Sequence, residues 1–476
     1  MPDHSIRTRS GTSAPLGDEA IERLASRMRG SVLTPDSPGY DEARAIWNAM
    51  IDRRPGLIAR CRGAADVMQA VRFAREHEAL VAVRGGGHNI AGSAVCDGGL
   101  MIDLTPMQSV LVDPETRTAR VEPGCTLSDL DHEAQAFGLA TPVGINSTTG
   151  IAGLTLGGGF GWLSRKHGMT IDNLLSADVV TAEGEFVRAS DTENFDLFWA
   201  IRGGGGNFGV VTSFEFRLHP VGPQVLAGLV VHPMEDAADV LRFYRAFTAT
   251  LSNDTAVWAV LRKAPPLPFL PAHWHGREVL VLAAFHAGDV EEGERVLRPL
   301  RAYGDPIADV VMPQSYAAWQ KTFDPLLAPG ARNYWKSHDF SELPDELLDT
   351  LVAYALRLPS DHTEIFIGQT GGAMRDVAPH ATAYPHRRTE FVMNVHTRWE
   401  EPAEDDRCIA WAREFFAATA PFAAGTVYVN FLTEDEAARV PAAYGANHER
   451  LGRLKHRYDP DNLFRGNQNI LPLAAV

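Results

Sequence analysis

Residues 81–92 read VAVRGGGHNIAG, an apolar strand pattern that leads directly into three glycines and a histidine. Because glycine has no Cβ, Gly85, Gly86 and Gly87 let backbone amides approach an anionic ligand closely. The segment follows the strand pattern LIARC and the helical pattern AADVMQAVRFAREH. Together they predict a strand, helix, strand unit that ends in a phosphate-binding loop. A tight turn with a surface histidine is the simpler alternative for so short a motif.

A second glycine-rich run, PVGINSTTGIAGLTLGGGFG, occupies residues 142–161. A ligand as long as a dinucleotide needs backbone donors from two segments of the chain, and two such segments are present. A GxGxxG match at Gly204, Gly206 and Gly209 follows a helical pattern and precedes a strand pattern. That order is the reverse of the Rossmann order, so this match does not predict NAD binding.

Composition and charge argue against several classes of function. The 476 residues are 45% hydrophobic and 22% charged, which predicts a globular chain with more than one core. A formal charge of −16 argues against nucleic acid and anionic membranes as partners. No apolar stretch predicts a membrane span or a secretory signal, so we expect a cytoplasmic protein. The scattered cysteines predict buried free thiols and no metal site.

The element pattern predicts an α+β protein with four segments. Residues 1–53 are expected to be mostly helical, with Asp18 as a helix cap. Residues 54–222 contain the glycine-rich runs. Residues 223–425 contain longer strands that alternate with helical patterns, which predicts an antiparallel sheet backed by helices. Residues 426–476 form a C-terminal segment, in which TVYVNF is expected to be a strand.

Five motifs occur in a fixed order: RGGGHNIAG, GIAGLTLGGGFG, HGMTIDNL, FWAIRGGGGNFGVVT and YDPDNLFRGNQNI. In that order they resemble the berberine bridge enzyme-like FAD oxidases, over nearly the whole chain. The resemblance implies a FAD-binding domain of the PCMH type, with the vanillyl-alcohol oxidase fold, over residues 54–222. It implies a substrate-binding domain over residues 223–425 and a return of residues 426–476 to the FAD-binding domain.

The resemblance also implies an oxidase that transfers hydride from a small alcohol or amine to FAD and then reduces molecular oxygen to hydrogen peroxide. A flavin dehydrogenase with another acceptor, an oxygenating or redox-neutral enzyme of natural-product biosynthesis, and a non-catalytic flavin-binding protein are the alternatives. The molecule is expected to be a monomer or a homodimer. An apolar lining that includes Trp399 and Phe431 would favour a cyclic or aromatic substrate.

In the resembled family, the histidine of the first motif is bonded to the flavin, which implies that His88 carries FAD covalently. Many relatives add a second bond through a cysteine, but the matching residue here is Asn146, so a single link is expected. Thr149 matches a position that lines the approach of oxygen, and its β-branched shape favours an oxidase. The other residues expected to bind FAD are Arg84, Gly85, Gly86, Gly87, Asn89, Gly92, Gly144, Ser147, Thr148, Gly150, Gly153, Gly158, Gly161, Asn173, Asn467 and Asn469.

The usual catalytic base of the family is absent from this sequence. Relatives often use the second tyrosine of a Y-x-N-Y strand, whereas residues 428–431 read YVNF. Because side chains alternate along a strand, Tyr428 is expected to face away from Phe431 and so cannot replace that tyrosine without a change of register.

The strand FVMNVHTRW offers another base. His396 and Asn394 share one face of it, which predicts His396 as the catalytic base and Asn394 as a residue that orients the substrate. A hydrogen-bonded structural histidine is the equally weighted alternative. Tyr334 and Lys336 are further candidates, because a nearby cation makes a phenol a better base.

Overall fold

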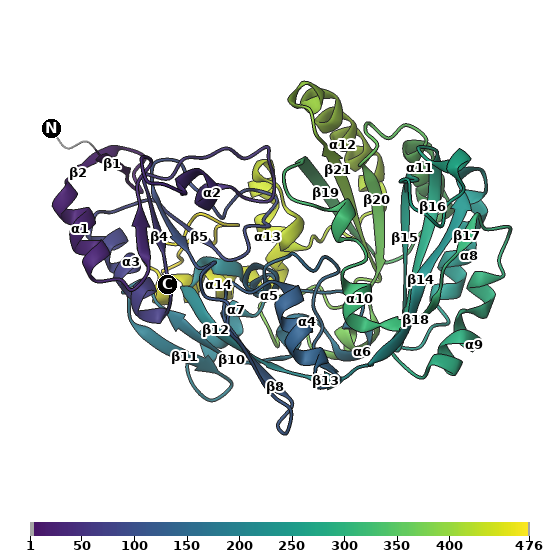
Figure 1. The fold of residues 1–476 in the computed structure, drawn as a ribbon, viewed down its shortest axis with the longest axis horizontal. Helices are drawn as coiled ribbons and strands as arrows, with labels where there is room; N and C mark the ends of the chain where they lie inside the picture. The colour runs from purple at the N-terminus through teal and green to yellow at the C-terminus, as the bar shows by residue number, and fades with distance from the viewer. Residues whose placement is uncertain (1–3, 475–476) are drawn as a thin grey trace.

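The computed structural model describes residues 4–474 of the chain (Figure 1). Its first residues form a hairpin of β1 (His4–Arg7) and β2 (Ser13–Leu16), then α1 (Asp18–Ser26), β3 (Ser31–Leu33) and α2 (Tyr40–Arg44). The prediction of a mostly helical segment over residues 1–53 is therefore wrong, because strand pairing takes up part of it. Asp18 is the first residue of α1, and Gly17 before it is the cap.

A four-stranded sheet follows, in the order β3-β4-β6-β5. Strand β4 (Leu57–Arg60) and β5 (Val81–Arg84) both pair in parallel with β6 (Leu100–Asp103). Helix α3 (Ala64–Glu76) connects β4 to β5 and buries Val67, Ala70 and Val71. The predicted strand, helix, strand unit is confirmed. Since parallel strands need a crossover, α3 delivers the chain to the glycine loop after β5.

A second, antiparallel sheet has the order β11-β10-β12-β8-β7. Its strands are β7 (Val110–Asp113), β8 (Thr118–Val121), β10 (Leu174–Val180), β11 (Phe186–Ser190) and β12 (Val210–Arg217). The short strands β9 (Leu139–Ala140) and β13 (His219–Pro220) pair with each other. The helices between these strands are α4 (Leu127–Gln135), α5 (Ile151–Leu156), α6 (Ser164–His167) and α7 (Phe195–Ile201). We call residues 54–222 the N-terminal half.

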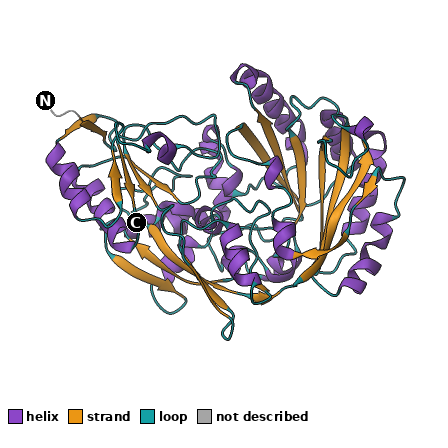
Figure 2. Cartoon of the chain, in the orientation of Figure 1, coloured by secondary structure: helices purple, strands orange, loops and turns teal. Residues whose placement is uncertain are grey.

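Residues 223–425 build one large antiparallel sheet in the order β17-β14-β16-β15-β20-β21-β19, with β18 paired to β14. The strands are β14 (Gln224–Pro233), β15 (Thr255–Lys263), β16 (Glu278–His286), β17 (Ala308–Asp309), β18 (Met312–Ser315), β19 (Arg332–Phe340), β20 (Glu364–Gln369) and β21 (Phe391–Trp399). Helices lie along its outer face in Figures 1 and 2: α8 (Ala237–Thr248), α9 (Val290–Arg301), α11 (Asp345–Ala355) and α12 (Asp405–Thr419). An antiparallel sheet backed by helices is thus confirmed.

The other face of the large sheet packs against the N-terminal half. Trp258 and Phe366 of the sheet share one hydrophobic cluster with Phe160, Trp162 and Met169. Helix α10 (Tyr316–Gln320) adds to this cluster and contacts α4. Apolar side chains of the large sheet therefore pack against apolar side chains from the loops between α5 and β10 at the centre of the molecule.

The C-terminal segment differs from the expected strand. Residues Val429–Phe431 form a short 3-10 turn, which is followed by α13 (Val440–Tyr444) and α14 (His448–Tyr458). Helix α14 contacts α7, and Leu463 and Phe464 pack in the core of the N-terminal half. The C-terminal segment thus returns to the N-terminal half, and Figure 1 shows α14 beside α7. Within residues 4–474, no helix has the length and apolar character needed to cross a membrane.

Candidate active site

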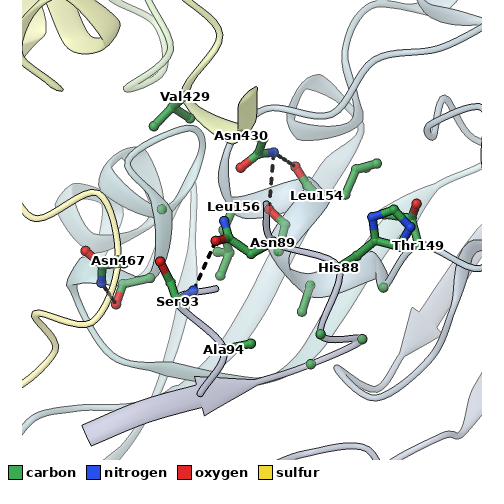
Figure 3. Close-up of a pocket in the computed structure, with 18 of the residues that line it drawn as sticks. His88, Asn89, Ser93, Ala94, Thr149, Leu154, Leu156, Val429, Asn430 and Asn467 are labelled. Carbon is green, nitrogen blue, oxygen red and sulfur yellow. Dashed lines mark hydrogen bonds between the residues drawn. The ribbon is translucent and has the colours of Figure 1, made fainter. Parts of the chain in front are cut away.

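A cavity of about 300 Å³ lies between the N-terminal half and the large sheet. Four segments form its wall: the loop after β5, the residues before and within α5, the turn between α7 and β12, and the C-terminal segment. Figure 3 labels His88, Thr149, Asn430 and Asn467 around it. Aromatic side chains and one histidine of the large sheet close the remaining side.

The two glycine runs meet in this wall. A Cβ placed on Gly86 would lie 2.5 Å from the Cα of Gly150, so the two backbones touch at a point where no side chain fits. The predicted cofactor residues that line the cavity are Gly85, Gly86, Gly87, His88, Asn89, Gly144, Asn146, Thr149, Gly150, Gly153 and Asn467. A glycine-lined wall of this kind suits the pyrophosphate of a dinucleotide.

Other predicted cofactor residues lie next to the cavity and support its loops. The Arg84 guanidinium donates to the carbonyl of Ala43, Thr148 donates to the side chain of Asn146, and Asn173 donates to the carbonyls of His167 and Met169. The predicted residues that the structure does not bring into the wall are Arg84, Gly92, Ser147, Thr148, Gly158, Gly161, Asn173 and Asn469.

Sequence reasoning missed a third glycine segment. Gly205, Gly206 and Gly209 lie on the turn between α7 and β12 and line the same cavity. The order of elements correctly excluded a Rossmann motif there, but the run of four glycines at residues 203–206 was itself a signal of close backbone approach. Phe464 and Gly466 of the last motif also line the cavity and were not predicted.

His88 stands in the wall directly after the first glycine run. Its ring stacks on Trp47, with the ring centroids 4.3 Å apart and the planes 22° apart. The amide nitrogen of Asn146 lies 3.5 Å from its Nε2. Burial lowers the pKa of His88 to about 4, so the imidazole is neutral at pH 7. Trp47 thus restrains the plane of the ring, and Asn146 lies near one of its nitrogens.

His396 projects from β21 into the same cavity. Its Nδ1 lies 3.0 Å from a carboxylate oxygen of Glu364, and its ring stacks on Trp335 with centroids 4.4 Å apart. Burial alone would raise the pKa of Glu364, but Arg262 and His396 lower it to about 2. Because an ionised carboxylate only accepts hydrogen bonds, Nδ1 carries a proton and Nε2 is left as the acceptor.

Tyr428 and Phe431 both line the cavity, contrary to the predicted strand alternation. The 3-10 turn at Val429–Phe431 brings their rings to a centroid distance of 4.9 Å. The Tyr428 hydroxyl oxygen accepts hydrogen bonds from the backbone N–H of Gly159 at 2.9 Å and from the Asn430 amide at 3.0 Å. Burial raises the pKa of Tyr428 to about 12, so the hydroxyl keeps its proton at neutral pH.

The remaining catalytic candidates lie elsewhere. Asn394 shares the inward face of β21 with His396, as alternation predicts, but it is fully buried and does not line the cavity. Tyr334 and Lys336 project from the opposite face of β19 and bind Asp435, at 2.6 Å and 2.9 Å. Burial raises the pKa of Tyr334, which makes it a poorer base.

The predicted apolar lining is only partly present. Phe431, Trp258, Trp335 and Phe366 line the cavity. Trp399, however, is buried on the helix-covered side of the sheet, where its indole donates to Asp405. No group of three or more metal-ligating side chains occurs among residues 4–474, and the four cysteines are buried free thiols.

Known proteins share these features. Residues 55–190 match the family model described as "FAD binding domain", and residues 427–471 match "Berberine and berberine like". The (R)-6-hydroxynicotine oxidase of Paenarthrobacter nicotinovorans is 32% identical over 466 residues, which are 94% of this chain and 97% of that protein. The xylooligosaccharide oxidase of Thermothelomyces thermophilus is 28% identical over 97% of each chain.

A solved structure agrees with the described fold. The crystal structure of 6-hydroxy-D-nicotine oxidase from Arthrobacter nicotinovorans superposes with a TM-score of 0.83 at 29% identity, covering 93% of this chain and 98% of that one. The glycine-lined wall, the family models and the full-length similarity to named oxidases agree with one another. The chain therefore belongs to the berberine bridge enzyme-like family of FAD-linked oxidoreductases.

Proposed function

We propose that the protein is an oxidase that holds FAD through a single covalent bond to His88 and oxidises a small cyclic or aromatic amine or alcohol. The observation that carries the proposal is the position of His88, in the wall of a glycine-lined cavity that His396 of the large sheet also lines. FAD, when bound, supplies a hydride acceptor whose electrons pass on to molecular oxygen, with hydrogen peroxide as the product.

The surroundings of His88 suit a covalent link. Its pKa of about 4 keeps the imidazole neutral, so a ring nitrogen has a lone pair available for bonding to carbon. Trp47 and Asn146 hold the ring in one orientation. Asn146 has no nucleophilic atom comparable to a thiolate, which supports one link rather than two.

His396 is the proposed base. An alcohol or ammonium substrate must lose a proton from its heteroatom as hydride leaves the adjacent carbon. The Nε2 of His396 accepts this proton, and the ionised Glu364 at 3.0 Å from Nδ1 stabilises the imidazolium that forms. Trp335 stacks on the ring and limits its rotation.

Tyr428 is the proposed hydrogen-bond donor to the substrate. Because two N–H groups already bind its oxygen, the hydroxyl proton is free to point into the cavity. A pKa of about 12 makes it a donor and not a base near neutral pH. Tyr428 thus orients the substrate heteroatom, a role first assigned to Asn394.

The cavity wall favours ring-containing and apolar substrates. Trp258, Trp335, Phe366 and Phe431 present flat apolar surfaces, on which a heterocycle or arene gains more than a hydrated sugar. The similarity to 6-hydroxynicotine oxidase supports an amine. Thr149, which also lines the cavity, is proposed to leave room for oxygen because its side chain is short and β-branched.

The test is an anaerobic screen with the purified flavoprotein. Pyrrolidines, benzylic amines and secondary alcohols are added, the loss of flavin absorbance is recorded, and air is then admitted. We expect at least one class to reduce the flavin and air to restore it with formation of hydrogen peroxide. Reduction without reoxidation by air would identify a dehydrogenase. A flavin that no compound in these classes reduces would refute the proposed activity.

A further inference from the structure

A second cavity, of about 60 Å³, adjoins the first on the inner face of the large sheet. The two cavities share five lining residues: Ile145, Trp258, Leu327, Phe366 and His396. The side chain proposed as the base therefore stands at the boundary between them. We call the smaller cavity the side chamber.

The lining of the side chamber is almost entirely hydrocarbon. Aliphatic side chains come from three neighbouring strands of the sheet: Leu229 and Val231 of β14, Val260 of β15, and Val279, Val281 and Ala283 of β16. The charged side chains in its wall, Arg262 and Glu364, are bound to each other at 2.7 Å, and Glu364 also binds His396. These charges are satisfied within the protein, so the chamber selects for an apolar ligand group.

The loop PPLPFLP, at residues 265–271, forms the outer wall of the chamber. Pro265, Leu267 and Phe269 line the chamber, while Pro266 and Pro268 between them are exposed. A hydrogen bond from the backbone N–H of Gly276 to the carbonyl of Ala264, 2.8 Å long, closes the base of the loop. The loop is a wall of the site and not only a surface connection.

We infer that the side chamber is a binding subsite for a short alkyl arm of the substrate, attached to the ring that occupies the main cavity. This inference rests on the proposed function and specifies its substrate class. The chamber is less than half the size of the roughly 150 Å³ cavity that holds a benzene ring, so by the same ratio it accommodates about two or three carbon atoms. A second ring would not fit.

The probes that test the inference are pyrrolidine and 2-alkylpyrrolidines with arms of one to eight carbons, bound to the holoenzyme. Their dissociation constants are measured anaerobically, from the spectral shift of the oxidised flavin before it is reduced or, where reduction is fast, from the concentration dependence of the reduction rate. We expect affinity to rise roughly fourfold with each methylene, up to about three carbons, and then to level off or fall. An affinity that does not change with arm length, or that rises through eight carbons, would overturn the inference.

The matched variants are Val260→Phe, which fills the chamber, and Val187→Phe, which places the same side chain on β11 of the other half. We expect the ratio of propyl-arm to pyrrolidine affinity to fall to about one in Val260→Phe and to persist in Val187→Phe. An unchanged ratio in Val260→Phe would contradict the subsite.

A second measurement separates the subsite from the proposed function. Xenon binds apolar cavities, so a crystal under xenon pressure should show an atom in the side chamber of the natural protein and none in Val260→Phe. If the alkyl arms and xenon bind but no amine or alcohol reduces the flavin, the proposed oxidase activity fails and the subsite stands. If pyrrolidine reduces the flavin but neither xenon nor the arms occupy the chamber, the subsite fails.

Discussion

The His88→Ala variant removes an imidazole that contacts Trp47 and Asn146 but leaves both glycine runs unchanged. We expect the flavin fluorescence of the polypeptide to disappear from a denaturing gel, because no other nucleophile is proposed to carry the link. His132→Ala, which replaces an exposed histidine on α4, is the control and should keep the fluorescence. Fluorescence retained by His88→Ala would show that another residue carries the cofactor.

Glu364 is proposed to act on the reaction only through His396. With a pKa of about 2 it is charged at any pH used for assay. Glu364→Gln removes the charge that stabilises the imidazolium formed when His396 takes the proton, so flavin reduction at pH 7 should slow about tenfold or more. His396→Gln, which removes the proposed base, should slow it about a hundredfold or more. Equal reduction rates in all three proteins would mean that neither residue takes part in the proton transfer.

The same carboxyl contributes to stability. Its folded-state pKa of about 2 lies below the unfolded value of about 4.3. The ionised carboxylate therefore contributes its full stabilisation above the unfolded value, and this stabilisation is lost as the pH falls toward 2. Stability of the natural protein in urea should therefore fall faster over this range than stability of Glu364→Gln. The proposed effect of Glu364 on catalysis is thus measured at assay pH, and its effect on stability is measured in acid.

At the scale of single elements, the loop after β5 depends on contact with the run before α5. A methyl group on Gly86 would collide with Gly150, and the atoms that it would meet are backbone atoms that cannot move aside alone. Gly86→Ala should lower the free energy of unfolding by about 1–3 kcal/mol or more, with loss of bound flavin. Gly17→Ala, where a Cβ meets no atom within 4 Å, should change neither thermal unfolding nor flavin content.

The two faces of strand β19 have different contacts: one lines the cavity and the other binds the C-terminal segment. Trp335 faces the cavity, whereas Lys336 binds Asp435 at 2.9 Å and Glu436 at 3.3 Å and so ties the C-terminal segment to the sheet. Lys336→Met removes the buried cation from these carboxylates, which keep Arg413 and Arg439 as partners, and should cost about 1–3 kcal/mol in urea unfolding. The folded fraction should still reduce its flavin at nearly the natural rate. A loss of reduction rate without a loss of stability would restore Lys336 as a catalytic candidate.

Elements differed in how far the sequence could predict them. The strand, helix, strand unit before His88 and the shared face of Asn394 and His396 follow from local periodicity, and both were predicted. The turn at Val429–Phe431 was not, because contacts of Tyr428 with Gly159, far away in the chain, override the strand pattern. Alternation also predicts that Tyr334 and Lys336 share one face of β19. Only the pairing of β19 with β21 decides which face of β19 lines the cavity.

For the whole molecule, the site depends on how the N-terminal half and the part of the chain that forms the large sheet are held together. Asp324, in the connection that leads to β19, accepts hydrogen bonds from the Ser147 backbone at 2.9 Å and from its hydroxyl at 2.5 Å. Asp324→Ala leaves two donors of the N-terminal half unpaired and should cost about 2 kcal/mol. Urea unfolding measures the loss, with Asp305→Ala, an exposed position, as the control. Equal stability of the two variants would show that this contact does not join the halves.

The wall of the main cavity is assembled from positions as distant as Gly85, Gly150, Gly206, Tyr428 and Gly466. During synthesis, Gly466 emerges long after Gly85, and the complete enclosure cannot form before it. If attachment at His88 requires that enclosure, covalent flavin forms only in a molecule that has folded completely. Flavin absorbance that survives denaturation would then measure how many chains reached the native state, including chains that have since unfolded.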